Sequence, residues 1–216
     1  MQPQDFNYKD NPAWRMFRII GEFTEGFEFI STLKKPVTVF GSARLTPQSH
    51  WYKEAARLGF LLSKHGYDVV TGGGPGIMEA ANRGSFNEHH GDSVGLNIKL
   101  DHEQRVNDYV QRSMAFHYFF TRKVVMSFSA RAFVYFPGGF GTLDELFEII
   151  TLVQTEKLPR VPVVLVGKEY WGGMMDFIER TMLHEYGTID TYDKKIITVV
   201  DTAEAAFRAI KKSVKK

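Results

Sequence analysis

Short apolar runs alternate along the chain with segments in which apolar residues recur every three or four positions. The first pattern is typical of strands buried on both faces, and the second of helices with one buried face. Strands are predicted at residues 37–40, 68–71, 93–98, 132–136, 161–166 and 196–200, and helices at 51–65, 76–87, 117–130, 143–156, 171–186 and 202–214. This alternation predicts an α/β fold with a doubly wound, mainly parallel sheet and helices on both faces.

A further helix is predicted at about residues 11–33, with Phe23, Phe27 and Ile30 on one face. A chain of 216 residues is long enough for one α/β domain with a substantial core, and no linker or internal repeat divides it. We therefore expect a single domain over residues 1–216. The first helix is expected to be an extension that caps this domain or a partner subunit.

Composition narrows the class of protein. The 27 Lys and Arg nearly balance the 25 Asp and Glu, so we expect neither nucleic acid nor a membrane surface as a partner. The chain has no cysteine, its first residues lack a signal-peptide pattern, and no apolar stretch approaches the ~20 residues needed to span a bilayer. None of the seven histidines stands in a metal-ligand spacing. We expect a cytoplasmic protein without a metal.

The most informative stretch is residues 133–147, where an apolar run meets a glycine-rich turn and then a helical pattern. Gly138, Gly139 and Gly141 allow a ligand to approach the backbone closely. The first N–H groups of the helix, and the positive end of its dipole, would face that ligand. The stretch therefore predicts a phosphate site, in which the Thr142 hydroxyl assists.

Two more small-residue turns follow predicted strands, so they are expected at the same edge of a parallel sheet. Gly73 and Gly74 belong to the first, and Gly41, Ser42 and Arg44 to the second. The dinucleotide fingerprint is not matched, because Ile77 stands where its third glycine should be, and no P-loop is present. Several turns at one edge favour one extended ligand, although each alone is equally typical of a tight strand-to-helix connection.

Arg122 and Lys123 lie in the predicted helix before residue 137. A guanidinium can clamp a phosphate or a sugar with its planar fork, which makes Arg122 the better candidate for binding. Lys123 is the weaker one. On the residues alone, an Arg-Lys pair on a helix is more often part of a solvated face.

The acids near the glycine turns also have structural interpretations. Thr142 and Glu145 have the spacing of a capping box, in which the two side chains bond backbone N–H groups at a helix start. Asp144 is explained by the helix dipole alone. Glu79, at the start of the helix that follows Gly73 and Gly74, is likewise explained either by a binding role or by the helix dipole.

The motif Pro137-Gly-Gly-Phe-Gly-Thr-Leu-Asp-Glu145, with Arg122-Lys123 upstream, resembles the signature of the LOG (Lonely guy) family, cytokinin riboside 5′-monophosphate phosphoribohydrolases often mislabelled lysine decarboxylases. The resemblance extends over roughly residues 36–185. It implies a Rossmann-like fold, a homodimer, and hydrolysis of the N-glycosidic bond of a purine nucleoside 5′-monophosphate. It also implies that Arg122 and Glu145 are the essential residues.

Plant-type members carry Met-His-x-Arg-Lys before the signature, whereas this chain reads Phe119-Phe-Thr-Arg-Lys123. AMP is therefore the expected substrate ahead of a prenylated cytokinin nucleotide. Glu145 would stabilise the positive charge on the ribose. Glu79 is the candidate for the acid that protonates the leaving purine base. No cofactor is expected, since nothing resembles a pyridoxal-phosphate site. The alternative is a non-catalytic carrier of a nucleotide or of molybdenum cofactor, which would return its ligand unchanged.

Overall fold

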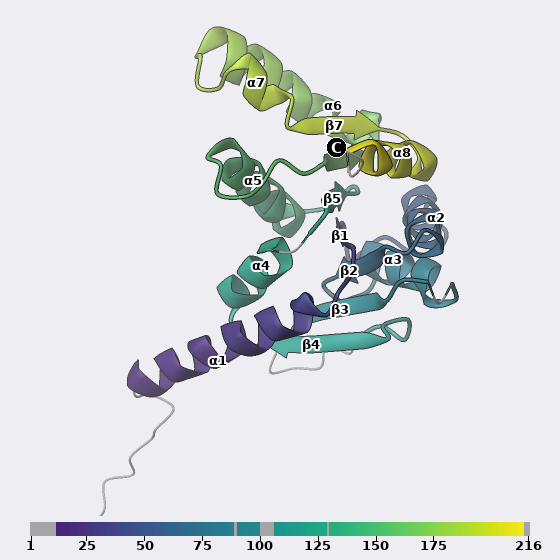
Figure 1. Cartoon of the computed structure of the whole chain (residues 1–216). Helices are drawn as coiled ribbons and strands as arrows, with labels where there is room; N and C mark the ends of the chain where they lie inside the picture. Colours follow the sequence, from purple (N-terminus) through teal and green to yellow (C-terminus); the bar gives the residue numbers. More distant parts are fainter. Residues whose placement is uncertain (1–11, 89, 100–105, 129, 214–216) are drawn as a thin grey trace, which may run out of the picture.

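Seven parallel strands form the sheet at the centre of the computed structural model, which describes residues 12–88, 90–99, 106–128 and 130–213 (Figure 1). Their spatial order is β4-β3-β2-β1-β5-β6-β7. The chain builds outward from β1 to β4, returns to the centre with β5, and builds outward again to β7. The order therefore reverses between β1 and β5, the position where open α/β sheets bind ligands. The strands are β1 (Pro36–Phe40), β2 (Asp68–Thr71), β3 (Ser93–Ile98), β4 (Arg112–Phe116), β5 (Ala132–Tyr135), β6 (Val163–Val166) and β7 (Ile197–Val200).

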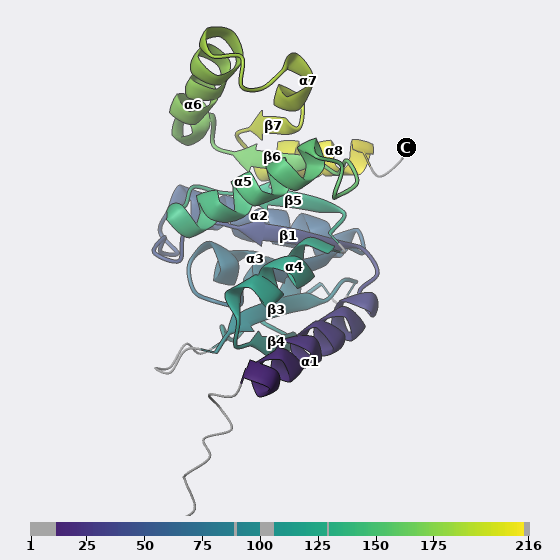
Figure 2. The ribbon, with the colours of Figure 1, turned by 90° about the vertical axis from the view of Figure 1, so that its left-hand side faces the viewer.

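Helices cover both faces of the sheet. One face carries α2, α3 and α8, and the other carries α1, α4, α5 and α6, as Figure 2 shows. The bounds are α1 (Pro12–Ser31), α2 (His50–Lys64), α3 (Ile77–Phe86), α4 (Phe119–Phe128), α5 (Phe140–Gln154), α6 (Lys168–Asp176), the π-helical segment η2 (Phe177–Glu185), α7 (Thr191–Lys194) and α8 (Ala203–Ser213). The predicted doubly wound, Rossmann-like α/β fold is confirmed.

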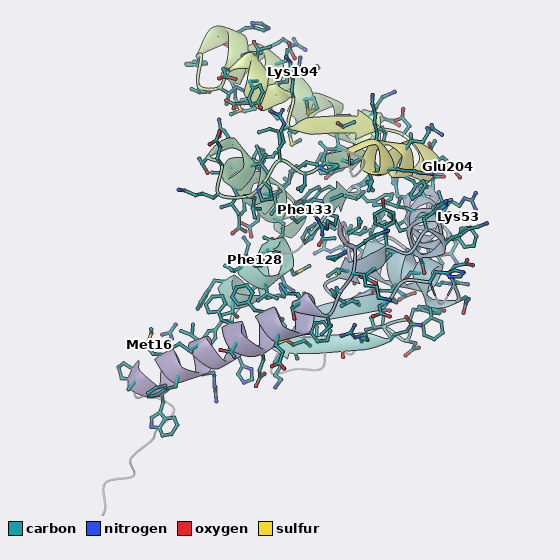
Figure 3. All side chains as sticks on the ribbon, viewed as in Figure 1. Met16, Lys53, Phe128, Phe133, Lys194 and Glu204 are labelled. Carbon is teal, nitrogen blue, oxygen red and sulfur yellow. The ribbon has the colours of Figure 1, made fainter. Side chains whose placement is uncertain are left out.

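The central strand β5 shows how the apolar runs build two cores. Phe133 and Tyr135 pack with α5 and α6, whereas Val134 between them packs with α2 and α3 (Figure 3 labels Phe133). Successive side chains of a strand point to opposite faces, so a strand covered on both sides is apolar throughout. All four residues of β5 are buried. The strand thus holds the glycine turn that follows it in a rigid position.

The six predicted strands are all present, and the structure adds a seventh, β4 (Arg112–Phe116), that the sequence pattern does not predict. This strand lies at the sheet edge and is mostly half-buried, so its sequence lacks the apolar run that marks the central strands. The short α7 (Thr191–Lys194) was also missed, although Asp190 caps it with a full capping box. The helix predicted at 171–186 begins earlier, at Lys168, and continues into η2. Residues 11, 129 and 214 of the predicted helices lie outside the described residues.

No helix within the described ranges is both long enough and apolar enough to cross a membrane.

Candidate active site

Three loops meet at the carboxyl ends of β1, β2 and β5. The Ser42 N–H donates to the Pro137 carbonyl at 3.0 Å, and the Ile77 N–H donates to the Ser42 carbonyl at 3.0 Å. Gly76 has a φ of 70°, and a Cβ there would come within 2.3 Å of the Ser42 carbonyl oxygen, so only glycine fits. These contacts confirm that the small-residue turns share one edge of the sheet, and they hold the loops together.

A cavity of about 710 Å³ opens between these loops and α4. Its lining includes the predicted site residues Gly41, Ser42, Arg44, Arg122, Gly139, Gly141, Thr142 and Glu145. The residues that line the cavity are Phe40, Gly41, Ser42, Ala43, Arg44, Gly72, Met78, Phe119, Arg122, Met126, Gly139, Phe140, Gly141, Thr142, Asp144 and Glu145. This volume lies within the range of small-molecule sites.

The helix α5 starts three residues before the predicted start at 143. Its N-cap is Gly139, without a side-chain cap, and the N–H of Thr142 donates to the Gly139 carbonyl at 3.0 Å. Thr142 is therefore the third residue of the helix, so the predicted capping box with Glu145 is wrong. The prediction of two acids in the first turn is also wrong, because Asp144 and Glu145 lie beyond it. The first turn of α5 is not visible in the sequence, because the repeat of apolar residues typical of a helix begins only after the glycines.

This earlier start places backbone donors at the cavity. Among the described residues, the N–H groups of Phe140 and Gly141 have no hydrogen-bond acceptor, and both residues line the cavity. Gly138 lies behind them, where an added Cβ would come within 2.1 Å of the Thr142 Oγ1. The N–H of Thr142 is already used by Gly139, which leaves two first-turn donors for an anion.

Glu145 is the buried acid of the cavity, with an exposed fraction of 6%. Burial raises the pKa of its carboxyl group from 4.5 to about 7, although the charges of Lys123 and Arg122 oppose the change. Within the described part of the chain, its Oε2 atom has no hydrogen-bond partner. A carboxyl group near half ionisation at neutral pH is suited to acid–base or electrostatic work.

Arg122 lies on α4, opposite Glu145, and lines the same cavity. Its guanidinium carbon lies 5.4 Å from the centre of the Phe119 ring. Burial lowers the pKa of the guanidinium, while the charge of Glu145 acts to raise it. No described residue accepts a hydrogen bond from its buried Nε. An arginine stays protonated in such surroundings, so a cation with a free donor faces the cavity.

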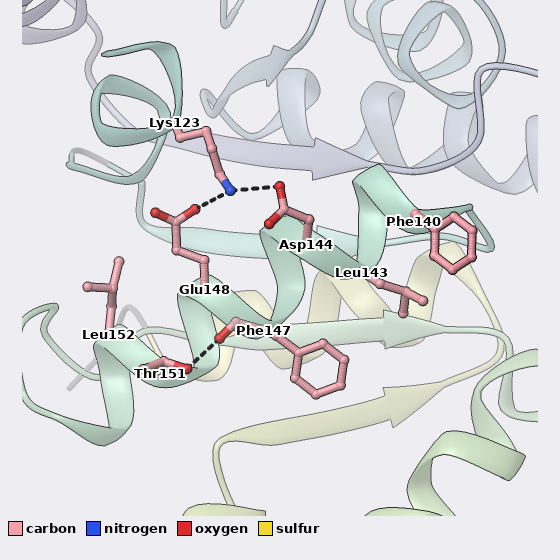
Figure 4. A pocket seen from close by; sticks show the side chains of 8 residues that line it. All are labelled: Lys123, Phe140, Leu143, Asp144, Phe147, Glu148, Thr151 and Leu152. Atoms are coloured by element: carbon pink, nitrogen blue, oxygen red, sulfur yellow. Dashed lines mark hydrogen bonds and ion pairs between the residues drawn. The ribbon is translucent and has the colours of Figure 1, made fainter. Parts of the chain in front are cut away.

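Lys123, the next residue, points elsewhere. Its Nζ bridges Asp144 at 2.7 Å and Glu148 at 2.8 Å on the outer side of α5 (Figure 4). Burial opposes the charged form of Lys123, but its bonds to the two carboxylates outweigh burial and raise the pKa of the ammonium group. Lys123 lines a neighbouring, more open pocket with Phe140 and Phe147, so in this structure it ties α4 to α5.

Three further predicted residues lie outside the cavity lining. The Gly73 N–H donates to the Thr71 Oγ1, and the side chain of Asn107 donates to the Gly74 carbonyl. Glu79 accepts a hydrogen bond from the Tyr52 hydroxyl at 2.7 Å. Burial, together with this bond, raises the pKa of Tyr52 to about 12. Gly73, Gly74 and Glu79 therefore support the loops from behind, whereas Gly72 of the same turn lines the cavity.

The sequence analysis missed the apolar residues of the site. Phe119 and Met126 of α4 line the cavity on the same side as Arg122, at intervals of three and four residues. The helical spacing around Arg122 was a signal that could have found them. Phe140, with an exposed fraction of 92%, stands at the mouth of the cavity. These side chains provide apolar surface for a flat ring.

Within the described residues, no group of three or more His, Asp or Glu side chains could hold a metal ion. The groups brought together here are two backbone donors, a guanidinium and a carboxyl group. They can bind an anion and stabilise positive charge close to it.

A matched pair of glycine substitutions tests the anion site. Gly141→Ala is expected to fold normally, because an added Cβ meets no atom within 4 Å and alanine favours a helix. It should nevertheless weaken phosphate binding about tenfold or more, since the methyl group would obstruct the close approach of the ligand. Titration calorimetry with inorganic phosphate and thermal melting measure the two effects.

Gly138→Ala is the control for this pair, because its Cβ would meet Thr142 and lower the stability of the turn itself. Wild-type phosphate affinity in Gly141→Ala would show that the anion does not bind at these N–H groups.

Comparisons with known proteins show what this chain is similar to. The sequence model of a family described as "Possible lysine decarboxylase" matches residues 78–210. A cytokinin riboside 5′-monophosphate phosphoribohydrolase of Arabidopsis thaliana is 28% identical over 82% of this chain and 81% of its own length. A second Arabidopsis phosphoribohydrolase of the same name is 32% identical over 71% and 72%. The Mycobacterium marinum protein of that name is 28% identical over 72% and 82%.

Solved structures also match. A structural-genomics X-ray structure, TM1055, is 25% identical, with a TM-score of 0.61 over 83% of this chain and 99% of the other. The molybdenum cofactor carrier protein of Chlamydomonas reinhardtii is 20% identical, with a TM-score of 0.63 over 85% of this chain and 100% of the other. At that identity the second likeness shows the shared fold alone.

Proposed function

Because this chain belongs to the LOG family, we propose that it hydrolyses the N-glycosidic bond of a purine nucleoside 5′-monophosphate. The reaction consumes one water molecule and releases the free base and ribose 5-phosphate. AMP is the proposed first substrate, and a cytokinin riboside 5′-monophosphate, named for the relatives, is the second. The reaction needs no metal and no cofactor.

One observation carries this proposal. The Nε of Arg122 and the Oε2 of Glu145 are buried at the same cavity, and neither has a hydrogen-bond partner among the described residues. Leaving a buried polar atom unpaired costs about 1–3 kcal/mol, so such atoms are expected where a ligand supplies the partner. A ribose phosphate offers both hydroxyl donors and phosphate acceptors to this pair.

The phosphate of the substrate would bind at the start of α5, on the N–H groups of Phe140 and Gly141. Thr142 and Ser42, which line the same cavity, would add bonds through their hydroxyl groups. The positive end of the α5 dipole favours an anion there. Arg122 would then bind the sugar and phosphate from the opposite wall and hold the substrate in its reactive pose.

Cleavage of the bond between C1′ and the base leaves positive charge on the ribose ring. The ionised carboxylate of Glu145 would stabilise this charge and accept a proton from the attacking water. The bonding electrons leave with the base, which takes up one proton, and the proton that the attacking water releases to Glu145 balances it over the whole reaction. Phe119 and Met126 would contact the flat face of that base.

We further propose that the protein works in the cytoplasm as a homodimer. Large apolar side chains remain exposed on α1, α4 and α5, including Met16, Phe17, Phe120, Phe128 and Phe147 (Figure 3 labels Met16 and Phe128). A group of exposed apolar side chains favours contact with another chain. The mass of the protein in solution, measured by light scattering, tests this assembly.

The carrier function remains the second candidate, because the molybdenum cofactor carrier of Chlamydomonas reinhardtii shares the fold. A carrier would bind AMP or a pterin nucleotide and return it unchanged. The free Arg122 and Glu145 pair favours hydrolysis, since a carrier has no need of a carboxyl group with a pKa near 7.

The test is to incubate the purified protein with AMP, without added metal or cofactor, and to follow adenine and ribose 5-phosphate by chromatography. Equal release of both products supports the proposed function. Intact AMP recovered from a tight complex would support the carrier, and the same assay with a cytokinin riboside 5′-monophosphate would compare the two substrates.

A further inference from the structure

Glu22 is a buried acid in the middle of α1, with an exposed fraction of 8%. Its carboxylate reaches the segment that leads into α4. The backbone N–H of His117 donates to Oε1 at 2.6 Å, and that of Tyr118 donates to Oε2 at 3.4 Å. The Thr121 hydroxyl, which also lies 2.8 Å from the Tyr118 carbonyl, donates to Oε2 at 2.6 Å. A buried carboxylate is stable only when its oxygens are bonded in this way.

These bonds join the start of α4 to α1, because the carboxylate accepts from the two backbone N–H groups just before α4 and from a hydroxyl group in its first turn. The first N–H groups of any helix lack partners within it, and an anion near them is stabilised by the helix dipole. His117 and Tyr118, which precede α4, are not residues with good capping side chains. The carboxylate from α1 therefore fixes the chain just before α4 and, through the Thr121 hydroxyl, the first turn of the helix.

Two more contacts hold α1 against α4 further along. Gly26 packs so closely that a Cβ there would come within 2.6 Å of a Val125 methyl group. The rings of Phe27 and Phe128 lie 4.9 Å apart. Figures 1 and 2 both show α1 running beside α4 and β4.

The helix α4 thus packs against α1 with one face and lines the cavity with another. Thr121, Val125 and Phe128 contact α1, whereas Phe119, Arg122 and Met126 line the cavity. The contacts with α1 decide how α4 is rotated about its own axis. That rotation aims Arg122, the neighbour of Thr121, at the cavity.

We propose that Glu22 is a positioning residue for the reaction, which fixes the first turn of α4 and thereby the reach of Arg122. This inference rests on the proposed function. It gives the N-terminal helix, which precedes the residues matched by the family model, a part in building the site.

The test is a double-mutant cycle with Glu22→Ala and Arg122→Lys, followed by AMP hydrolysis. Glu22→Ala alone should lower kcat/KM about 10–100-fold, because a displacement of about 1 Å is enough for such a loss. The loss should appear mainly in kcat. The affinity for inorganic phosphate should fall much less than kcat/KM, since its proposed backbone donors lie on α5 and only its contact with Arg122 is disturbed.

The cycle separates positioning from general stability. If Glu22 acts through Arg122, Glu22→Ala should add less than about threefold in the Arg122→Lys background, because coupled residues are not additive. Losses that multiply, or full activity in Glu22→Ala, would overturn the proposal. Glu22→Gln, which keeps one acceptor, should retain intermediate activity, and it replaces Glu22→Ala in the cycle if the alanine variant does not fold.

Glu25→Ala is the matched control, since it removes an equal charge from the exposed side of the same helix and should keep wild-type activity. If the wild type does not hydrolyse AMP, the proposed function fails by itself. The same cycle is then measured as AMP affinity by calorimetry, where additive losses would still refute the role of Glu22.

Discussion

Replacing Glu145 with glutamine is expected to remove nearly all hydrolysis and, at pH 8, to make the folded protein more stable. The activity loss follows from the loss of the carboxylate that would face the charged ribose. Removing one such electrostatic group costs about 10²–10³-fold in kcat. Glutamine is close in size and polar, so the cavity keeps its shape. Chromatographic assay of adenine release measures this loss.

The gain in stability follows from the buried carboxyl group. Burial raises the pKa of Glu145 from 4.5 to about 7 in the folded protein. Between these values the folded state binds more protons than the unfolded state, so the wild type loses stability as the pH rises through this window. Glutamine has no such penalty. The variant should therefore gain up to about 3 kcal/mol above pH 7, and close to nothing at pH 4.5.

Thermal melting of both proteins at pH 5 and pH 8 measures this difference. The wild-type kcat/KM should rise with pH, with a midpoint near 7, as Glu145 ionises. Glu169→Gln is a matched control, because Glu169 is exposed on α6 and lies outside the lining of the cavity. A glutamine variant at 145 that hydrolyses AMP as fast as the wild type would exclude Glu145 from the chemistry.

Arg122→Lys is expected to lower kcat/KM about 100-fold or more, although it keeps the positive charge. A lysine cannot replace the planar fork that binds two oxygens at once, and its ammonium group would not occupy the position of Nε. Arg122→Ala should lose activity further. It should also move the midpoint of the pH profile above 7, because the charge of Arg122 lowers the pKa of Glu145.

The comparison of the two arginine variants separates charge from geometry. In Arg122→Lys the midpoint should stay close to 7, whereas the rate falls. Arg131→Ala, which removes an exposed arginine just beyond α4, is the control and should leave both unchanged. Similar rates for Arg122→Lys and the wild type would show that only the charge at this position matters.

The central strands were predictable because a strand covered on both faces must be apolar throughout. Residues 132–136 and 161–166 have this composition, and they became β5 and β6. The edge strand β4 was not predictable in the same way, since Arg112–Phe116 is only partly covered and its backbone pairs with one neighbour. Its position depends on hydrogen bonds to β3, and the local sequence of β4 does not encode that pairing.

The site shows the same division. The turn at Gly138, Gly139 and Gly141 was visible in the sequence, because only small residues let the backbone approach a ligand. The start of α5 was placed three residues late, and a capping box was predicted in its place. The error arose because glycine carries no helical signal, while Thr142 and Glu145 have the spacing of a cap.

The sequence by itself determined the alternation of strands and helices and the glycine turn after β5, and its resemblance to the LOG family pointed to the acid and the arginine of the candidate site. Only the tertiary structure decided which charged groups stay free. Arg122 and Lys123 are neighbours in sequence, yet helical geometry turns one into the cavity and the other toward Asp144 and Glu148. The pKa of Glu145 and the bonds of Glu22 likewise depend on burial between elements distant in the chain, which no local pattern encodes.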